Sequence, residues 1–358
     1  MELQFLQEVA AAPVRTPHPE DAIFDGSQAA AGMIQALEYV IENPSSVTIK
    51  WDGIPALVFG RNADGKLIVT DKYMFDKPNG RVTSPQGWVE YDQARGANRG
   101  DLYQRINNIW AGLDEAVGSS NGFFWGDLLW SQPLQPKNGM YVFKPNVVEY
   151  HIPVKSNVGQ IIKGRAGGVV VHTYLSDEQA RPQPWNGEGL KLDGSVAILT
   201  PSAGIKFKLD DPVQVHRAAA TAVKQYGTIS DKFLAGLDKV AQAAIKTYTN
   251  KRITGQTSEE LPDWLVNNVS KVQYNKLVGE NFGGYLYRNA KGLTGLLNIW
   301  NAVYAFKVNL AQQLEKQIQG MQQFVNGRPE GEGFVFSTPQ GPVKLVQRGT
   351  FSQALFNK

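Results

Sequence analysis

The chain contains no cysteine among its 358 residues, so disulfide bonds, thiolate metal sites and cysteine nucleophiles are excluded. It also lacks any apolar run approaching about eighteen residues, which predicts that no segment spans a membrane. The first residues show no basic segment ahead of an apolar one, and this argues against a secretory signal. The expected compartment is the cytoplasm.

A large charge of either sign is missing too. The 36 basic and 33 acidic side chains give a formal net charge of +3, which permits a nucleic-acid partner without indicating one. A hydrophobic content of 42% with 19% charged residues is typical of a soluble globular protein with a substantial core. The length exceeds one typical domain, so we expect two domains or one large domain that carries an insertion.

The segment around Lys50 is the most distinctive part of the sequence. Lys50, Asp52 and Gly53 form a Lys-x-Asp-Gly corner between a β-branched approach and an apolar run that ends at Gly60. Burying these polar groups in a core would be costly, which favours a functional role. Glycine lets the backbone approach a ligand closely, and a lysine can bind phosphate or, when its pKa is lowered, act as a nucleophile. A strand-end turn with a solvated lysine is the alternative.

Three further motifs follow in order. Residues 124–127 read aromatic-x-Gly-Asp, Glu332 opens a strand-like run, and Lys344 lies in the next such run. On adjacent strands that face one pocket, a carboxylate can bind Mg²⁺ and a lysine can bind a phosphate. For the last two motifs, the alternative is an ordinary hairpin with a charged end.

The order of these four motifs resembles motifs I, III, IV and V of the covalent nucleotidyltransferases, which are the ATP-dependent DNA ligases, the RNA ligases and the mRNA capping enzymes. The resemblance covers about residues 50–210 and 328–350. It implies an α+β fold, a ligase-type adenylation domain of antiparallel sheets with flanking helices. It also implies that Lys50 attacks the α-phosphate of ATP to form lysyl-AMP. The AMP would then pass to a 5′-phosphate end, and a 3′-hydroxyl would displace it.

The same resemblance implies roles for individual residues. Glu332 and Asp127 would hold Mg²⁺. Phe143 lies where the family places an aromatic side chain that stacks on the base, and a core strand is the alternative for this segment. Arg61 and Arg348 are displaced substitutes for cations that the family carries closer to its motifs I and V. The residues expected to bind ATP and its metal are therefore Asp52, Gly53, Arg61, Asp127, Phe143, Glu332, Lys344 and Arg348.

Some positions depart from the family pattern. Asp127 stands where the family has glutamate, and Val346 stands where it has a second lysine. Only ten residues follow Arg348, so we expect no C-terminal OB-fold. The expected function is a monomeric polynucleotide ligase, with DNA and RNA both open as substrates. The alternatives are adenylylation of a small molecule or protein, and a catalytically inactive nucleotide-binding relative.

Residue composition divides the chain into three parts. Residues 1–210 and 328–358 carry strand signals, whereas residues 211–327 are rich in alanine, leucine, lysine and glutamine at helical spacing. We therefore expect an adenylation domain that is interrupted by an all-helical insertion. The helices expected in the insertion cover residues 213–225, 230–247, 261–278 and 294–324.

The expected helix over residues 230–247 carries Lys232, Lys239 and Lys246 at intervals of seven residues. On one helix they would share a face, with steps of roughly 10 Å that could follow the phosphates of a duplex. A solvated face on a supporting bundle is the alternative. His151 and His172 have no metal-ligand partner at a useful spacing, so we interpret both as structural or surface residues.

Overall fold

The computed structural model describes residues 17–268, 282–346 and 348, except for positions 78, 178, 254, 319 and 340. Its fold is α+β, and its strands pair antiparallel with the exception of β9 (Val196–Leu199), which pairs in parallel with β7 (Gly167–Leu175). This confirms the coarse fold class expected from the sequence. Within the described residues, every helix is too short or too polar to cross a lipid bilayer.

The elements follow the order of the chain. The helical segments are η1 (Pro19–Asp25), α1 (Ser27–Glu42), η2 (Pro44–Ser46), α2 (Lys72–Phe75), α3 (Pro85–Ala94), α4 (Asp101–Val117), α5 (Asn157–Ile162), α6 (Val213–Ala235), α7 (Lys239–Ile253), α8 (Leu261–Asn268), α10 (Phe282–Arg288) and α11 (Ala290–Glu315). The remaining strands are β1 (Val47–Ile49), β2 (Ala56–Arg61), β3 (Leu67–Asp71), β4 (Phe123–Trp130), β5 (Met140–Phe143), β6 (Val148–Pro153), β8 (Gln183–Pro184), β10 (Gln322–Val325), β11 (Arg328–Pro329), β12 (Phe334–Thr338) and β13 (Gly341–Leu345).

The largest sheet has the strand order β3-β2-β4-β7-β8. Its strands alternate inward and outward side chains, so Leu57, Phe59 and Phe124 form one apolar face. This face packs against Ile109 and Leu113 of α4 and is closed by α3 and α4. The opposite face of β3, β2 and β4 carries a smaller apolar cluster made of Val58, Ile68, Phe75, Phe123 and Leu175. We call it the open face.

Two smaller sheets join segments that are distant in the sequence. One has the order β11-β10-β6-β5, and the other has the order β1-β12-β13. In the second, Thr48 lies opposite Val335, and the Thr48 hydroxyl donates a hydrogen bond to the Val335 carbonyl across a separation of 287 residues. This pairing brings the segment after β1 next to the segment before β12.

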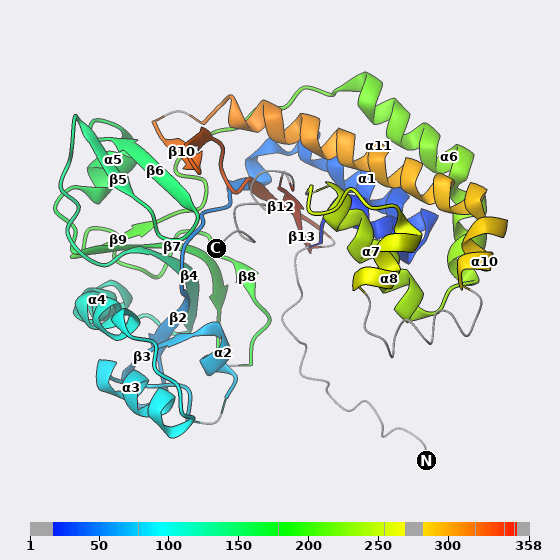
Figure 1. The fold of residues 1–358 in the computed structure, drawn as a ribbon. Helices are drawn as coiled ribbons and strands as arrows, with labels where there is room; N and C mark the ends of the chain where they lie inside the picture. The colour runs from blue at the N-terminus through cyan, green and yellow to red at the C-terminus, as the bar shows by residue number, and fades with distance from the viewer. Residues whose placement is uncertain are drawn as a thin grey trace, which may run out of the picture.

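The helices on the other side of the molecule form one bundle with the N-terminal part of the chain. Figure 1 shows α11 running along α6, with α1 packed beside them and β12 and β13 between the bundle and the sheets. Leu37 of α1, Leu296 of α11 and Phe334 of β12 belong to one hydrophobic core. The compositional boundary at residue 211 therefore does not divide the hydrophobic core, because residues before and after it pack in the same core.

The expected helix over residues 230–247 is wrong. The chain divides there into α6 and α7, with Gly236 at the C-cap of α6. The Asp238 carboxylate accepts a hydrogen bond from the Ala241 backbone N–H at 2.7 Å and so starts a new helix. The helix expected over residues 261–278 is described as α8 to Asn268, and its remainder lies outside the described residues.

Two other predictions also need correction. The helix expected to reach residue 324 ends at Glu315, because the chain turns at Gly320, where φ is 73°, and then forms β10 beside β6. The strand signals of residues 1–210 extend over residues 205–209, but this segment forms no strand. Its backbone bonds to glutamine side chains of the helical bundle instead, since the Lys208 N–H donates to the Gln317 Oε1 at 2.8 Å.

Candidate functional site

Lys50 follows the last residue of β1, and its backbone N–H donates to the Gly333 carbonyl at 2.9 Å. This bond extends the β1-β12 pairing and places Glu332 beside it. The Lys50 ammonium and the Glu332 carboxylate form an ion pair. Their side chains are 29% and 11% exposed, so the lysine head remains accessible to a ligand.

The Lys-x-Asp-Gly corner lies directly against β4. The Ile54 N–H donates to the Leu128 carbonyl at 2.9 Å, and Ala56 pairs with Asp127. A Cβ atom added to Gly53 would lie 2.5 Å from the Cβ of Asp127, which is closer than real side chains approach. Glycine is therefore required at this position for the corner to meet Asp127.

Asp127 has the most perturbed carboxyl of the site. Burial raises its pKa to about 7, and the neighbouring charges of Glu332 and Asp52 act in the same direction, while Lys50 and Lys72 oppose them. The Asp127 side chain is 23% exposed to solvent. The carboxyl thus sits deep among protein atoms and remains reachable from solvent, an arrangement that is common at functional sites.

Glu332 lies in a similar environment. Burial raises the pKa of its carboxyl, and the positive charges of Lys50 and Lys344 oppose the rise. Lys344 lies opposite Val335 in the β12-β13 pairing, one strand away from the Glu332 segment. The charges of Lys50 and Glu332 therefore act on Asp127, and the charges of Lys50 and Lys344 act on Glu332.

Asp52 is near these residues, but its carboxylate is occupied by hydrogen bonds from other protein groups. It accepts hydrogen bonds from the Asn146 side chain at 2.7 Å, from the Val147 N–H, and from the Val148 N–H at 2.7 Å. The residue is 5% exposed. Asp52 therefore holds the Lys-x-Asp-Gly corner in place, and its expected contact with ATP is corrected to this positioning role.

Three of the residues expected to bind ATP lie away from the Lys50 cluster: Phe143, Arg61 and Arg348. Phe143 is buried in the core, with ring centroids 5.1 Å from Trp130 and 5.2 Å from Tyr150, so it presents no surface for a base. Arg61 lies at the far end of β2, where it binds the Asp114 carboxylate at 2.7 Å.

Arg348 is a member of a buried ionic cluster at the N-terminal end of the bundle. Its guanidinium pairs with the Asp21 carboxylate at 2.6 Å and with the Glu20 carboxylate at 3.2 Å. Lys307 pairs with the same Glu20 at 2.6 Å. This cluster fastens the end of the described chain to η1 and α11, so Arg348 is not part of the candidate site.

The three lysines expected on one helix face do not share one. Lys232 lies near the end of α6, whereas Lys239 begins α7 and Lys246 lies further along it. The Lys246 ammonium is 3.7 Å from the Asp21 carboxylate, which draws it toward the bundle. The expected face of three lysines on one helix is therefore wrong, because the break between α6 and α7 separates Lys232 from Lys239 and Lys246, which remain seven residues apart on α7.

His172 on β7, which the sequence led us to interpret as a structural or surface residue, lies beside the site. The pairing of β4 with β7 shifts register between Trp125 and Gly126, which leaves His172 as an extra residue in a β-bulge. Its Nε2 atom lies 3.7 Å from the Asp127 Oδ2 atom. Burial lowers the pKa of His172 to about 4, and the positive charge of Lys50 contributes. No local sequence signal marks a bulge, so this residue could not be found without the strand pairing.

Lys72 was also missed. It follows β3, whose last residue Asp71 pairs with Leu57 of β2, and Leu57 in turn pairs with Gly126. Lys72, the first residue of α2, therefore follows directly on this row of paired residues, and its charge lowers the pKa of the Asp127 carboxyl. The Asp71 side chain caps α2 by accepting from the Tyr73 and Met74 N–H groups at 2.8 Å, which fixes this position.

The carboxylates of the site could contribute ligands to a metal ion. Within the described residues, no group of three His, Asp or Glu side chains could hold a metal by itself. Glu332 and Asp127 offer two carboxylates, and Mg²⁺ is commonly bound through one or two carboxylates together with substrate phosphates. The residues thus fit a Mg²⁺ ion that enters with a nucleotide.

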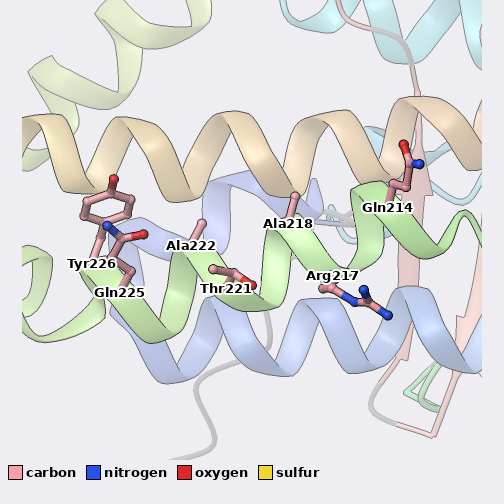
Figure 2. A pocket seen from close by; sticks show the side chains of 7 residues that line it. All are labelled: Gln214, Arg217, Ala218, Thr221, Ala222, Gln225 and Tyr226. Carbon is pink, nitrogen blue, oxygen red and sulfur yellow. The ribbon is translucent and has the colours of Figure 1, made fainter.

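One hollow of the described surface lies away from this site. It has a volume of about 470 Å³ and lies on α6, as Figure 2 shows. A hollow of about 290 Å³ lies nearer to the site, because Gly331 and Gly333 on either side of Glu332 line it together with Phe324. The candidate site at Lys50 therefore rests on its charged residues and their contacts, and not on a deep pocket.

Comparisons with known proteins add one assignment. Neither the curated proteins nor the solved structures give a match. A model of the family of unknown function DUF6267 matches residues 16–358, and the chain therefore belongs to this family.

Proposed function

We propose that the chain is a covalent nucleotidyltransferase that uses ATP to adenylylate its own Lys50. The observation that carries the proposal is the ion pair of Lys50 and Glu332 beside Asp127. These residues lie in three separate motif-like segments, and the paired two are 282 residues apart in the sequence. A lysine surrounded by carboxylates, with a second lysine on the neighbouring strand, can bind and attack a phosphate.

In the proposed step, the Lys50 nitrogen attacks the α-phosphorus of ATP. A phosphorus–nitrogen bond forms, the bond between the α-phosphorus and the bridging oxygen breaks, and pyrophosphate leaves. The Lys50 ammonium would release its proton to solvent before the attack, and Glu332, the carboxylate in contact with it, would hold the nitrogen in position. Lys344 and Lys72 would bind phosphate oxygens as point charges. Mg²⁺, held by Glu332 and Asp127, would neutralise charge on the phosphates when bound.

The acceptor that we propose is a polynucleotide end, which makes the chain an ATP-dependent ligase of the cytoplasm. The AMP would pass to a 5′-phosphate, and a 3′-hydroxyl would then displace it. One observation favours a second candidate, adenylylation of an acceptor that is not a nucleic acid. Lys232 lies on α6, whereas Lys239 and Lys246 lie on α7, so the row of three lysines that argued for a duplex clamp is reduced to two.

The test is incubation with Mg²⁺ and ATP that is radiolabelled at the α-phosphate, followed by denaturing electrophoresis. The wild-type chain should carry an acid-labile label, and Lys50→Ala should carry none. Lys191→Ala is the matched control, because Lys191 also forms an ion pair, with Glu115 at 2.7 Å, but lies outside the site. Labelling of Lys50→Ala at the wild-type level would refute the proposal.

A second measurement separates the two acceptors. Labelled protein is mixed with nicked duplex DNA or with RNA ends that carry a 5′-phosphate. Transfer of the label to either nucleic acid, followed by sealing, supports the ligase. A label that stays on the protein in both mixtures would favour the other acceptor class.

A further inference from the structure

Two adjacent strand pairs of β2 and β4 on the open face lead away from the site. In the first pair, Ala56 lies opposite Asp127. Lys72, the first residue of α2, follows the neighbouring strand β3. In the next pair, Val58 lies opposite Trp125. Because alternate residues of a strand point to the same face, Trp125 and Asp127 share the open face. Their positions along β4 are about 7 Å apart, the length of two strand residues.

Trp125 differs from most tryptophans of the chain. Trp51, Trp88, Trp130, Trp185, Trp264 and Trp300 are buried in the core. Trp125 and Trp110 are half-buried, and Trp110 packs on the opposite, helix-covered side of the sheet. Trp125 packs one part of its ring against the apolar cluster of the open face and leaves the remainder exposed.

His172 extends the surface that Trp125 offers. The ring centroids of the two side chains lie 6.1 Å apart with an interplanar angle of 46°. The β-bulge places this imidazole beside Trp125 and also within 3.7 Å of Asp127. A tryptophan and an imidazole thus form an aromatic surface that begins next to the carboxylates and lysines of the site.

We propose that Trp125 and His172 form the platform on which the nucleobase of the bound nucleotide packs, with its phosphates directed toward Lys50. This inference rests on the proposed function. Aromatic faces bind bases by stacking, which tolerates any base because every base has a π face. The platform takes the place of Phe143, whose ring is enclosed between Trp130 and Tyr150.

The test compares ATP with ribose 5′-triphosphate, which has no base, in the Lys50 labelling reaction. Trp125→Leu keeps an apolar side chain on the cluster but removes the ring. It should raise the KM for ATP by about 5- to 150-fold, equal to ~1–3 kcal/mol for one base–aromatic stack at ~1.4 kcal/mol per tenfold. The rate at saturation should change little. The KM for the base-free triphosphate should stay at its wild-type value. Trp110→Leu is the matched control and should leave both KM values unchanged.

A second measurement covers the case in which Trp125→Leu does not fold. Trp125→Phe keeps an aromatic ring, should keep labelling, and should lose the change in tryptophan fluorescence that ATP causes in the wild type. An unchanged KM in folded Trp125→Leu, or a full fluorescence change in Trp125→Phe, would overturn the platform. Absence of label on wild-type Lys50 would instead refute the proposed function, and the fluorescence difference would still decide whether Trp125 contacts ATP.

Discussion

Replacing Asp127 with asparagine should stabilise the metal-free protein above neutral pH and leave its stability in acid nearly unchanged. Burial raises the pKa of this carboxyl from 3.8 to about 7. Between these values the folded carboxyl keeps a proton that the unfolded one has released, so stability falls as pH rises from about 4 to about 7. The loss is complete above pH 7, where the folded chain holds a buried carboxylate.

The size of the effect follows from the same shift. A rise of about 3 in pKa corresponds to about 4 kcal/mol, at about 1.36 kcal/mol per pH unit. The Asp127 side chain is 23% exposed, and the new amide must itself find hydrogen-bond partners. We therefore expect Asp127→Asn to gain about 1–3 kcal/mol at pH 8 and close to zero at pH 4.

The assay is urea unfolding with EDTA at several pH values between 4 and 8. The difference in unfolding free energy between Asp127→Asn and the wild type should grow with pH and level off above 7. Asp64→Asn is the control, because Asp64 lies exposed in a turn and its replacement should show no such trend. A gain that is equal at pH 4 and pH 8, or a loss at pH 8, would refute the reasoning about burial.

Three further predictions follow from contacts described above. Gly53→Ala should lower the free energy of unfolding by about 1–3 kcal/mol and abolish Lys50 labelling, because the added methyl group would clash with Asp127. Urea unfolding measures the first effect and the ATP label measures the second, and normal labelling would contradict the prediction. Glu332→Gln should reduce the labelling rate about 10²- to 10³-fold, the scale of a lost charge interaction in a closed site, with rate measurements at saturating ATP as the check. Lys307→Ala should cost about 3–5 kcal/mol in urea unfolding because it leaves the Glu20 carboxylate buried without this partner, and a cost below about 1 kcal/mol would be inconsistent with that burial.

The parts of the fold that were predictable are those with strong local patterns. Short β-branched runs predict strands over residues 67–70 and 168–174, where β3 and β7 lie, and helical spacing predicts a helix from residue 101 to 113, where α4 lies. The break between α6 and α7 falls inside the helix expected over residues 230–247, at Gly236 and Asp238. Glycine followed by a capping residue ends one helix and begins another, and this local signal was available.

The candidate site was only partly predictable for a different reason. Lys50, Asp127 and Glu332 could be grouped because motif order carries information on long-range pairing. The parts played by Trp125 and His172 depend on a register shift between β4 and β7, which is a property of the paired strands. Phe143 was assigned wrongly because the sequence shows an aromatic strand residue but does not show which of its faces is covered.

The pairing of β1 with β12 also has a consequence for the synthesis of the protein. The ribosome completes the Lys50 segment early, but its carboxylate partner on the β12 side emerges only after residue 332 has been added. A nascent chain therefore carries an incomplete site until Glu332 and the strand β12 that follows it have been translated. Products of premature termination before that point would lack both Glu332 and the strand that orders Lys50, and they would be unable to consume ATP by the proposed reaction.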